Sequence, residues 1–428
     1  RAGLTTLLLA SAALAACTPP APVANPAASV SPARLAELYE RRDCFALRDA
    51  LAGAPEGGPP ALAFYRAAVD VAFNRPEQAI PELRRFIGAG GADAGLMARA
   101  HTLLADAYVR TYRYRDAADT YRLLAGGTAS DSAGRGDAAN VLGLWEGLRG
   151  APAQTVAADG PVRLATTRDR ANLVNVEAEA NGQRIPFVYD TGANLSTVIE
   201  TTAREMGMRM LDATVMVGTV TGGRTAARVA IAPELRLGDA TVRNAAFLVF
   251  PDSALAFPQI GYQIRGIIGF PVIAAFGAST LARGGGIVLG DTVARDEGPA
   301  NLCLDGLTPI IAVAIGGERL HFGMDTGAQS TDLYLAYFRA HRAELESGGA
   351  PDSVSFGGAG GMRRGLAYRL QPLDLRVGGR DVRVPSVRVF AERTSEASER
   401  LFGNLGQDVF GQFESMTLDF RTMHLRLR

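Results

Sequence analysis

Two copies of the triplet Asp-Thr-Gly are the residues of this sequence best suited to chemistry. They lie at 190–192 and 325–327, and each follows an apolar run and precedes an alanine and a nearby Ser-Thr pair. One such triplet is weak evidence, because Asp and Gly are ordinary turn residues. Two copies in matched surroundings indicate one site. If folding brings the carboxyl groups of Asp190 and Asp325 within about 3 Å, they cannot both ionise easily and share one proton.

A pair of carboxyl groups that holds a single proton can activate water. The ionised carboxylate acts as a general base on the water, while the protonated carboxyl donates to the carbonyl oxygen under attack. This chemistry needs neither a covalent intermediate nor a cofactor. The chain has four His and no HExxH or CxxC spacing, so the sequence predicts no metal site.

The surroundings of the triplets repeat on both sides. Asn-Gly at 181–182 and Gly-Gly at 316–317 predict two-residue hairpin turns ahead of each Asp. Downstream, 266–272 and 403–409 share the frame Gly-x-x-Gly-x-x-Val. The second glycine of this frame follows its Asp by 79 residues in the first copy and by 81 in the second. A repeat of this length predicts one folding unit used twice.

This arrangement resembles the aspartic proteases of the pepsin and retropepsin group. In that group each of two β lobes supplies one Asp-Thr-Gly and one apolar-apolar-Gly segment that passes beneath it. The alanine after each triplet is similar to the retropepsin form. The resemblance covers roughly 160–428 and implies lobes at 160–297 and 298–428, with Asp190 and Asp325 as the catalytic pair.

The resemblance also implies roles for the rest of each triplet. Thr191 and Thr326 would hydrogen-bond across the lobe interface and hold the two loops together. Gly192 and Gly327 lack side chains, which lets the backbone come close and donate an amide to a carboxylate. Because one chain supplies both Asp residues, no dimer is required.

Two glycine-rich segments, 218–223 and 357–361, follow their Asp by about 30 residues, where the resemblance implies hairpins that close over substrate. Ordinary surface loops are the alternative. The flap candidates are Gly222, Gly223, Gly358 and Gly360.

Five other residues carry less information about function. His321 lies before the second triplet and is interpreted as a strand-face residue. Asn404 stands where the group usually has an apolar residue, which leaves the packing of lobe two in question. Asp408 is a candidate for a charge at a helix terminus. Cys44 and Cys303 fall in different predicted domains, so free thiols and a disulfide are both open.

The first residues indicate a compartment. Residues 7–17 form an apolar run that is too short to span a bilayer and predicts a signal peptide. Residues 14–17, Leu-Ala-Ala-Cys, resemble the bacterial lipobox; a plain secretory signal is the alternative. We therefore expect a signal peptide at 1–17, a lipid on Cys17 and a periplasm-facing envelope protein. Thr18 after the Cys favours the outer membrane.

Between the signal and the triplets the pattern is helical. A Pro/Ala-rich linker is expected at 18–32. Ala and Leu at three- and four-residue spacing predict a helical domain at 33–150. Residues 104–121 resemble one tetratricopeptide repeat, and a weaker copy lies 38 residues earlier. An ordinary helical bundle is the alternative. The domain offers no chemistry, so its expected role is spacing or binding a protein partner.

After a second linker, short alternating runs predict strands at 173–179, 245–250 and 382–389. The expected fold class is an all-α, repeat-like N-domain followed by an all-β, two-lobed aspartic protease. The charges of the 44 basic and 44 acidic side chains cancel, so the protein has no net positive charge that would attract nucleic acid.

The sequence therefore predicts an aspartic endopeptidase that acts on polypeptides and is held at a membrane by lipid. Two other classes remain as hypotheses. One is a non-catalytic lipoprotein that keeps the fold and binds peptide in its cleft. The other is an assembly scaffold that acts through the helical domain. Intact Asp-Thr-Gly in both lobes favours catalysis.

Overall fold

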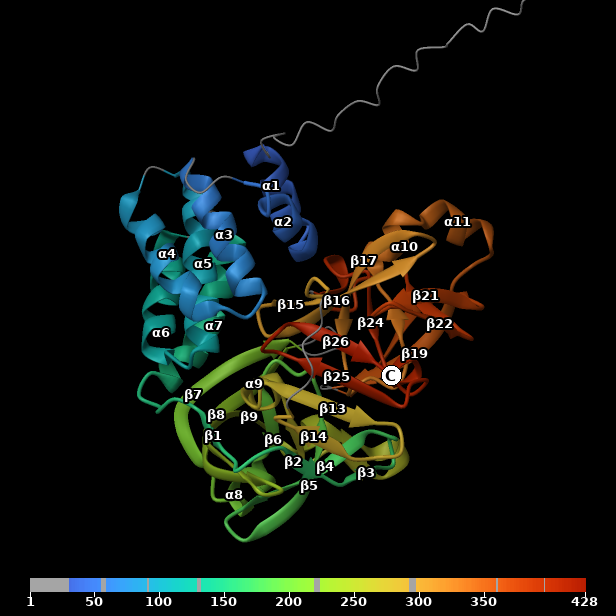
Figure 1. The fold of residues 1–428 in the computed structure, drawn as a ribbon. Coiled ribbons are helices and arrows are strands. Elements are labelled where there is room, and N and C mark those ends of the chain that lie inside the picture. The colour runs from blue at the N-terminus through green and yellow to red at the C-terminus, as the bar shows by residue number, and fades with distance from the viewer. Residues whose placement is uncertain are drawn as a thin grey trace, which may run out of the picture.

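The N-terminal part of the chain is helical, and the rest is largely β and forms two lobes (Figure 1). This arrangement confirms the predicted fold class. The computed structural model describes residues 31–54, 59–90, 92–128, 132–218, 224–291, 298–358, 361–395 and 397–428. The predicted signal, Cys17 and most of the first linker lie outside these residues.

The helical part contains three helix pairs, and each pair is joined by the same type of turn. The pairs are α1 (Pro32–Glu40) with α2 (Cys44–Leu51), α3 (Pro60–Ala72) with α4 (Pro76–Ala89), and α5 (Ala94–Arg110) with α6 (Tyr114–Leu123). Each pair turns at a residue with φ of 56°, namely Arg42, Asn74 and Tyr112. The fully buried Ala79 and Ala117 let neighbouring helices approach closely. The three pairs therefore use one supersecondary unit, while the tetratricopeptide assignment stays a prediction.

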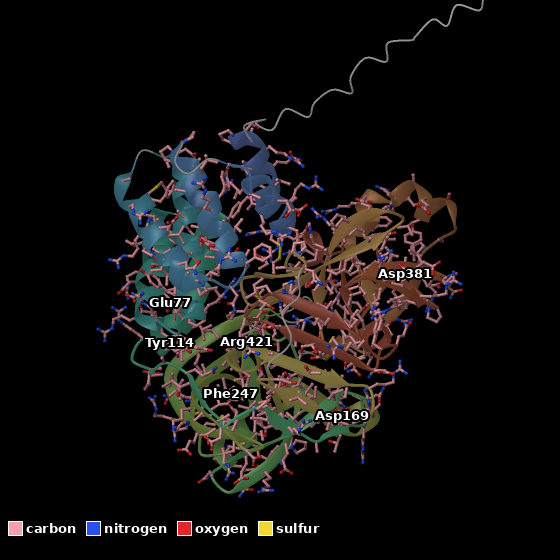
Figure 2. All side chains as sticks on the ribbon, viewed as in Figure 1. Glu77, Tyr114, Asp169, Phe247, Asp381 and Arg421 are labelled. Atoms are coloured by element: carbon pink, nitrogen blue, oxygen red, sulfur yellow. A yellow bond between two sulfur atoms is a disulfide. The ribbon has the colours of Figure 1, made fainter. Side chains whose placement is uncertain are left out.

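A seventh helix, α7 (Ser132–Leu148), joins the helical part to lobe one. The sheet of lobe one contains β1 (Thr155–Ala157), β3 (Thr166–Arg168), β4 (Val174–Ala180), β5 (Gln183–Tyr189), β6 (Ser196–Ile199), β7 (Arg209–Gly218), β8 (Arg224–Leu237), β9 (Ala240–Phe250) and β12 (Gly266–Ile268). A small ladder and two short helices complete the lobe: β10 (Ala256–Phe257), β11 (Tyr262–Gln263), α8 (Glu200–Glu205) and α9 (Phe270–Ala275). Phe247 lies inside this lobe with 1% of its surface exposed (Figure 2).

Lobe two repeats this plan. Its sheet contains β15 (Leu302–Asp305), β16 (Thr308–Ile315), β17 (Glu318–Met324), β18 (Asp332–Leu333), β19 (Asp352–Gly358), β20 (Gly361–Leu370), β21 (Leu373–Val377), β22 (Arg380–Val384), β23 (Val387–Phe390) and β24 (Gly403–Leu405). Its helices are α10 (Leu335–Ala340), α11 (Arg342–Ser347) and α12 (Gln407–Phe410). In lobe one β12 is parallel to β5 and antiparallel to β6, and β24 pairs in the same way with β17 and β18. The sequence repeat is thus one topology used twice.

The hairpin turns predicted before each Asp are confirmed. Asn181 and Gly182 have φ of 51° and 70°, and Gly316 and Gly317 have φ of 58° and 86°. Two successive positive φ values suit Asn-Gly and Gly-Gly and match the twist of the flanking strands. The prediction of one strand at 382–389 was wrong. The structure has two strands there, β22 and β23, on either side of a proline, which has no backbone N–H to donate to a neighbouring strand.

A third sheet, which the sequence did not indicate, joins the lobes. Its order is β2 (Val162–Leu164), β14 (Ile287–Leu289), β13 (Ala278–Ala282), β25 (Ser415–Asp419) and β26 (His424–Leu427). β13 from lobe one pairs with β25 from the end of the chain over five residues. The two lobes therefore share backbone hydrogen bonds as well as an interface.

The helical part packs against both lobes (Figure 1). A disulfide joins Cys44 at the start of α2 to Cys303 on β15. Of the two alternatives that the sequence left open, free thiols or a disulfide, the structure has the disulfide. The amide of Asn74 also donates to the carbonyl of Phe420 over 2.8 Å. His321, buried on β17, lies 3.2 Å from the carboxylate of Asp43 and so contacts the helical part. No helix among the described residues is long and apolar enough to cross a membrane.

Candidate active site

The two triplets occupy equivalent turns at the ends of equivalent strands. Asp190 follows β5, and its backbone amide donates to the carbonyl of Ile268 on β12 over 3.1 Å. Asp325 follows β17, and its amide donates to the carbonyl of Leu405 on β24 over 3.2 Å. The strand pairing that defines each lobe therefore also fixes the position of each Asp.

The glycines of the triplets show how close the two Asp side chains lie. A Cβ atom added at Gly192 would be 2.7 Å from the carboxyl carbon of Asp325. One added at Gly327 would be 2.6 Å from the carboxyl carbon of Asp190. Each carboxyl group thus lies against the glycine of the opposite lobe, as a two-fold related pair must. Gly192 is exposed and both Asp residues are half-buried, so solvent reaches the edge of the pair while most of each carboxyl group is covered.

Backbone amides hold one oxygen of each carboxyl group. Gly192 and Ala193 donate to Oδ1 of Asp190 over 2.8 and 3.2 Å. In lobe two the corresponding amides donate to Oδ1 of Asp325, from Gly327 over 2.8 Å and from the following alanine over 3.0 Å. These bonds orient both carboxyl groups before any substrate is present.

The two threonines cross the lobe interface. The amide of Thr191 donates to Oγ1 of Thr326 over 3.0 Å, and the amide of Thr326 donates to Oγ1 of Thr191 over 3.2 Å. Each hydroxyl then donates to a carbonyl of the other lobe, at Met324 and Tyr189, over 2.9 and 2.8 Å. All four bonds are buried, so they fix the relative position of the two Asp turns.

The electrostatics are those of a carboxyl pair that holds a proton. Burial raises the pKa of Asp190 well above its usual value, and the charge of Asp325 and a hydrogen bond to it raise that pKa further. The amides of Gly192 and Ala193 oppose this rise. The arrangement therefore favours a protonated Asp190.

Glycines beneath the turns leave room for the backbone. The amides of Gly269 and Gly406 donate to the hydroxyls of Ser196 and Thr331 over 3.0 and 3.1 Å. An added Cβ at either glycine would collide with the backbone of the segment after the triplet. This close approach explains the second glycine of the repeated frame. Asp408 lies in the first turn of α12, as the sequence indicated, and accepts from the amide and hydroxyl of Thr331.

One polar contact to the pair was missed from the sequence. The side-chain amide of Asn404, in the middle of β24, donates to Oδ2 of Asp325 over 3.0 Å. The sequence signal was present, since Ile267 stands at the equivalent place in lobe one, but it was interpreted only as a question of packing. The described part of the chain contains no group of three His, Cys, Asp or Glu side chains placed to hold a metal.

The predicted flaps fall on two hairpins. β7 and β8 form one in lobe one, and β19 and β20 form the other in lobe two. Gly358 ends β19 and pairs with Gly361. Gly222, Gly223 and Gly360 lie outside the described residues.

Two side-chain hydrogen bonds close to the triplets in the chain also link the lobes. The hydroxyl of Thr308 donates to Asn194 over 3.0 Å, and the amide of Gln329 donates to the carbonyl of Ala171. Asn194 also lines a cavity of about 420 Å³ where the helical part meets both lobes. Arg110 of α5 lines the same cavity, so the helical part contributes to this cavity, whose lining includes neither Asp190 nor Asp325.

Comparison with known proteins agrees with this geometry in lobe one. Residues 176–272 match a family model described as aspartyl protease, and the match spans Asp190 and the glycine frame beneath it. No curated protein matches the chain. Among solved structures, basic 7S globulin from soybean is similar, with 13% identity, a TM-score of 0.40, and coverage of 62% of this chain and 93% of that one.

Proposed function

We propose that the protein is an aspartic endopeptidase of retropepsin type that hydrolyses peptide bonds with water held between Asp190 and Asp325. The observation that carries the proposal is the reciprocal approach of each carboxyl group to the glycine of the other lobe. The crossed bonds of Thr191 and Thr326 support it, because they fix that approach. The aspartyl protease match over 176–272 supports the same chemistry.

In the proposed reaction one carboxylate takes a proton from water, whose oxygen attacks the peptide carbonyl. The protonated partner donates to the carbonyl oxygen in the same step. Collapse of the tetrahedral intermediate breaks the C–N bond as the nitrogen gains a proton, which leaves a new carboxyl terminus and a new amine. The two hairpins, β7–β8 and β19–β20, are proposed to close over the bound chain.

The proposed location is the bacterial envelope, with a lipid on Cys17. The disulfide between Cys44 and Cys303 supports an oxidising compartment, where such bonds persist. Cys17→Ser should move the protein from the membrane fraction to the soluble envelope fraction. An unchanged membrane fraction would contradict the lipid anchor.

The function is tested with a peptide library and purified residues 31–428. We expect cleavage at internal peptide bonds by the native protein and none by Asp190→Asn, which keeps the shape but loses the shared proton. A protein that only binds peptide would retain its peptides without cleaving them. A helical scaffold would show neither cleavage nor dependence on Asp190.

A further inference from the structure

The two lobes differ at one matched pair of residues beneath the carboxyl groups. In lobe one Ile267 on β12 pairs with Val188 on β5. In lobe two Asn404 on β24 pairs with Gly323 on β17. The register is otherwise equivalent, so an apolar pair in one lobe is replaced by an amide and a glycine in the other.

The glycine and the amide fit each other. A Cβ added at Gly323 would lie 2.8 Å from Oδ1 of Asn404, so the missing side chain leaves the space that the amide occupies. The nitrogen of the same amide then reaches Oδ2 of Asp325 over 3.0 Å. Only the nitrogen of an amide can donate to a carboxylate, so this orientation suits an ionised Asp325.

The two carboxyl groups therefore accept different numbers of hydrogen bonds. Asp325 accepts from two backbone amides and from Asn404. Asp190 accepts from two backbone amides, and Ile267, the counterpart of Asn404, has no donor in its side chain. A hydrogen bond donated to a carboxylate stabilises its ionised form.

Resting on the proposed function, we propose that Asn404, in the space left by Gly323, assigns the general base to Asp325 and the general acid to Asp190. Asn404 is a positioning residue, because it acts through Asp325. The raised pKa of Asp190 agrees with this assignment.

Charged groups near Asp325 also differ from those of lobe one, because Asp332 pairs with Asn404 where Thr197 pairs with Ile267. Asp332 interacts electrostatically with Asp325 and accepts two hydrogen bonds from Arg388, each 2.7 Å long. Asp408 is near Asp332 and is bonded to Thr331. These groups stay unchanged when Asn404 is replaced.

The sharpest variant gives lobe two the residues of lobe one, as Gly323→Val with Asn404→Ile. Asn404→Ala is the second variant, because it removes the donor without adding bulk. Ile267→Val is the matched control in lobe one. Each is assayed for cleavage against pH, and the carboxyl groups are titrated by ¹³C NMR.

The expected change is confined to one limb of the pH profile. In the proposed assignment the single proton lies on Asp190, so Asn404 donates to a carboxylate in both the singly protonated pair and the fully ionised pair and stabilises both forms. Its loss should raise the acid limb by about one pH unit and leave the alkaline limb in place. The titration should show the same rise in the first macroscopic pKa of the pair.

A lower rate with both limbs unmoved would overturn the inference, because it would show that Asn404 only packs. A rise of both limbs together would overturn it too. If the native protein cleaves nothing, the proposed function fails, and the titration still decides whether Asn404 sets the first ionisation.

Discussion

The two carboxyl groups can lie close together because each faces a glycine of the other lobe. Gly327 faces Asp190 so closely that a single added methyl group would meet the carboxyl carbon at 2.6 Å. Gly327→Ala should therefore push the two carboxyl groups apart. A displacement of about 1 Å at a reacting group can lower the rate by about 100-fold.

This prediction is measured as kcat/KM for Gly327→Ala against Gly88→Ala. Gly88 lies in α4, and an added Cβ there meets no atom within 4 Å. We expect a large loss for the first variant and native activity for the second. Native activity in both would show that the close approach is not needed.

The raised pKa of Asp190 predicts a stability that depends on pH. In the folded protein Asp190 keeps its proton, while in the unfolded chain it loses the proton above the usual value of 3.8. The stability present at lower pH is therefore lost as the pH rises toward the folded-state pKa. Asn cannot ionise, so Asp190→Asn should be more stable than the native protein at pH 7, by about 1 kcal/mol or more.

Urea unfolding at pH 3.5 and pH 7 measures this difference. The gain from Asp190→Asn should be present at the higher pH and largely absent at the lower one. A gain of equal size at both would contradict the assignment of the proton to Asp190.

At the scale of elements, α7 covers the strand that leads into the lobe-one hairpin. Asn140 donates to the carbonyl of Met216 on β7 over 2.9 Å. A Cβ added at Gly147 would overlap the side chain of Ala213 on the same strand. Gly147→Leu should therefore displace the helix and cost about 1–3 kcal/mol of unfolding free energy.

The same helix provides the control. Gly136 is exposed, and an added Cβ there meets nothing within 4 Å, so Gly136→Ala should stabilise the helix slightly. Thermal unfolding of both variants separates packing from helix propensity. Equal stability of Gly147→Leu and the native protein would show that the contact between α7 and β7 contributes little.

The elements that could be predicted from the sequence are those marked by short motifs of neighbouring residues. The hairpin turns, the paired Asp strands and the glycine frames each depend on residues close together in the chain. The sheet that joins the lobes was not predictable in this way, because its partners Thr280 and Thr417 are 137 residues apart. The role of Asn404 was missed for a different reason: its segment was expected beneath Asp325, but its polar side chain was interpreted only as a question of packing.

At the scale of the whole molecule, the helical part is bound to the β lobes by covalent and non-covalent contacts. Cys44 and Cys303 close a loop of 259 residues, which restricts the unfolded chain strongly. Cys44→Ser with Cys303→Ser should lower the free energy of unfolding by about 2–5 kcal/mol. The measurement is urea unfolding without reductant, in a Cys17→Ser background.

A thiol count provides the control for this prediction. The unfolded Cys17→Ser protein should expose no reactive thiol until a reductant is added, and two afterwards. Two reactive thiols before reduction would contradict the disulfide and the covalent link between the helical part and lobe two.

The central claim is that Asp190 and Asp325 act as one unit on water. The measurement that tests it most directly is peptide cleavage by the native protein, Asp190→Asn, Asp325→Asn and the double variant under identical conditions. Because groups acting as a unit are not additive, each single variant should lose nearly all turnover and the double variant should lose little more. Substantial cleavage by the purified double variant would contradict the account, since the chemistry would then arise elsewhere in the molecule.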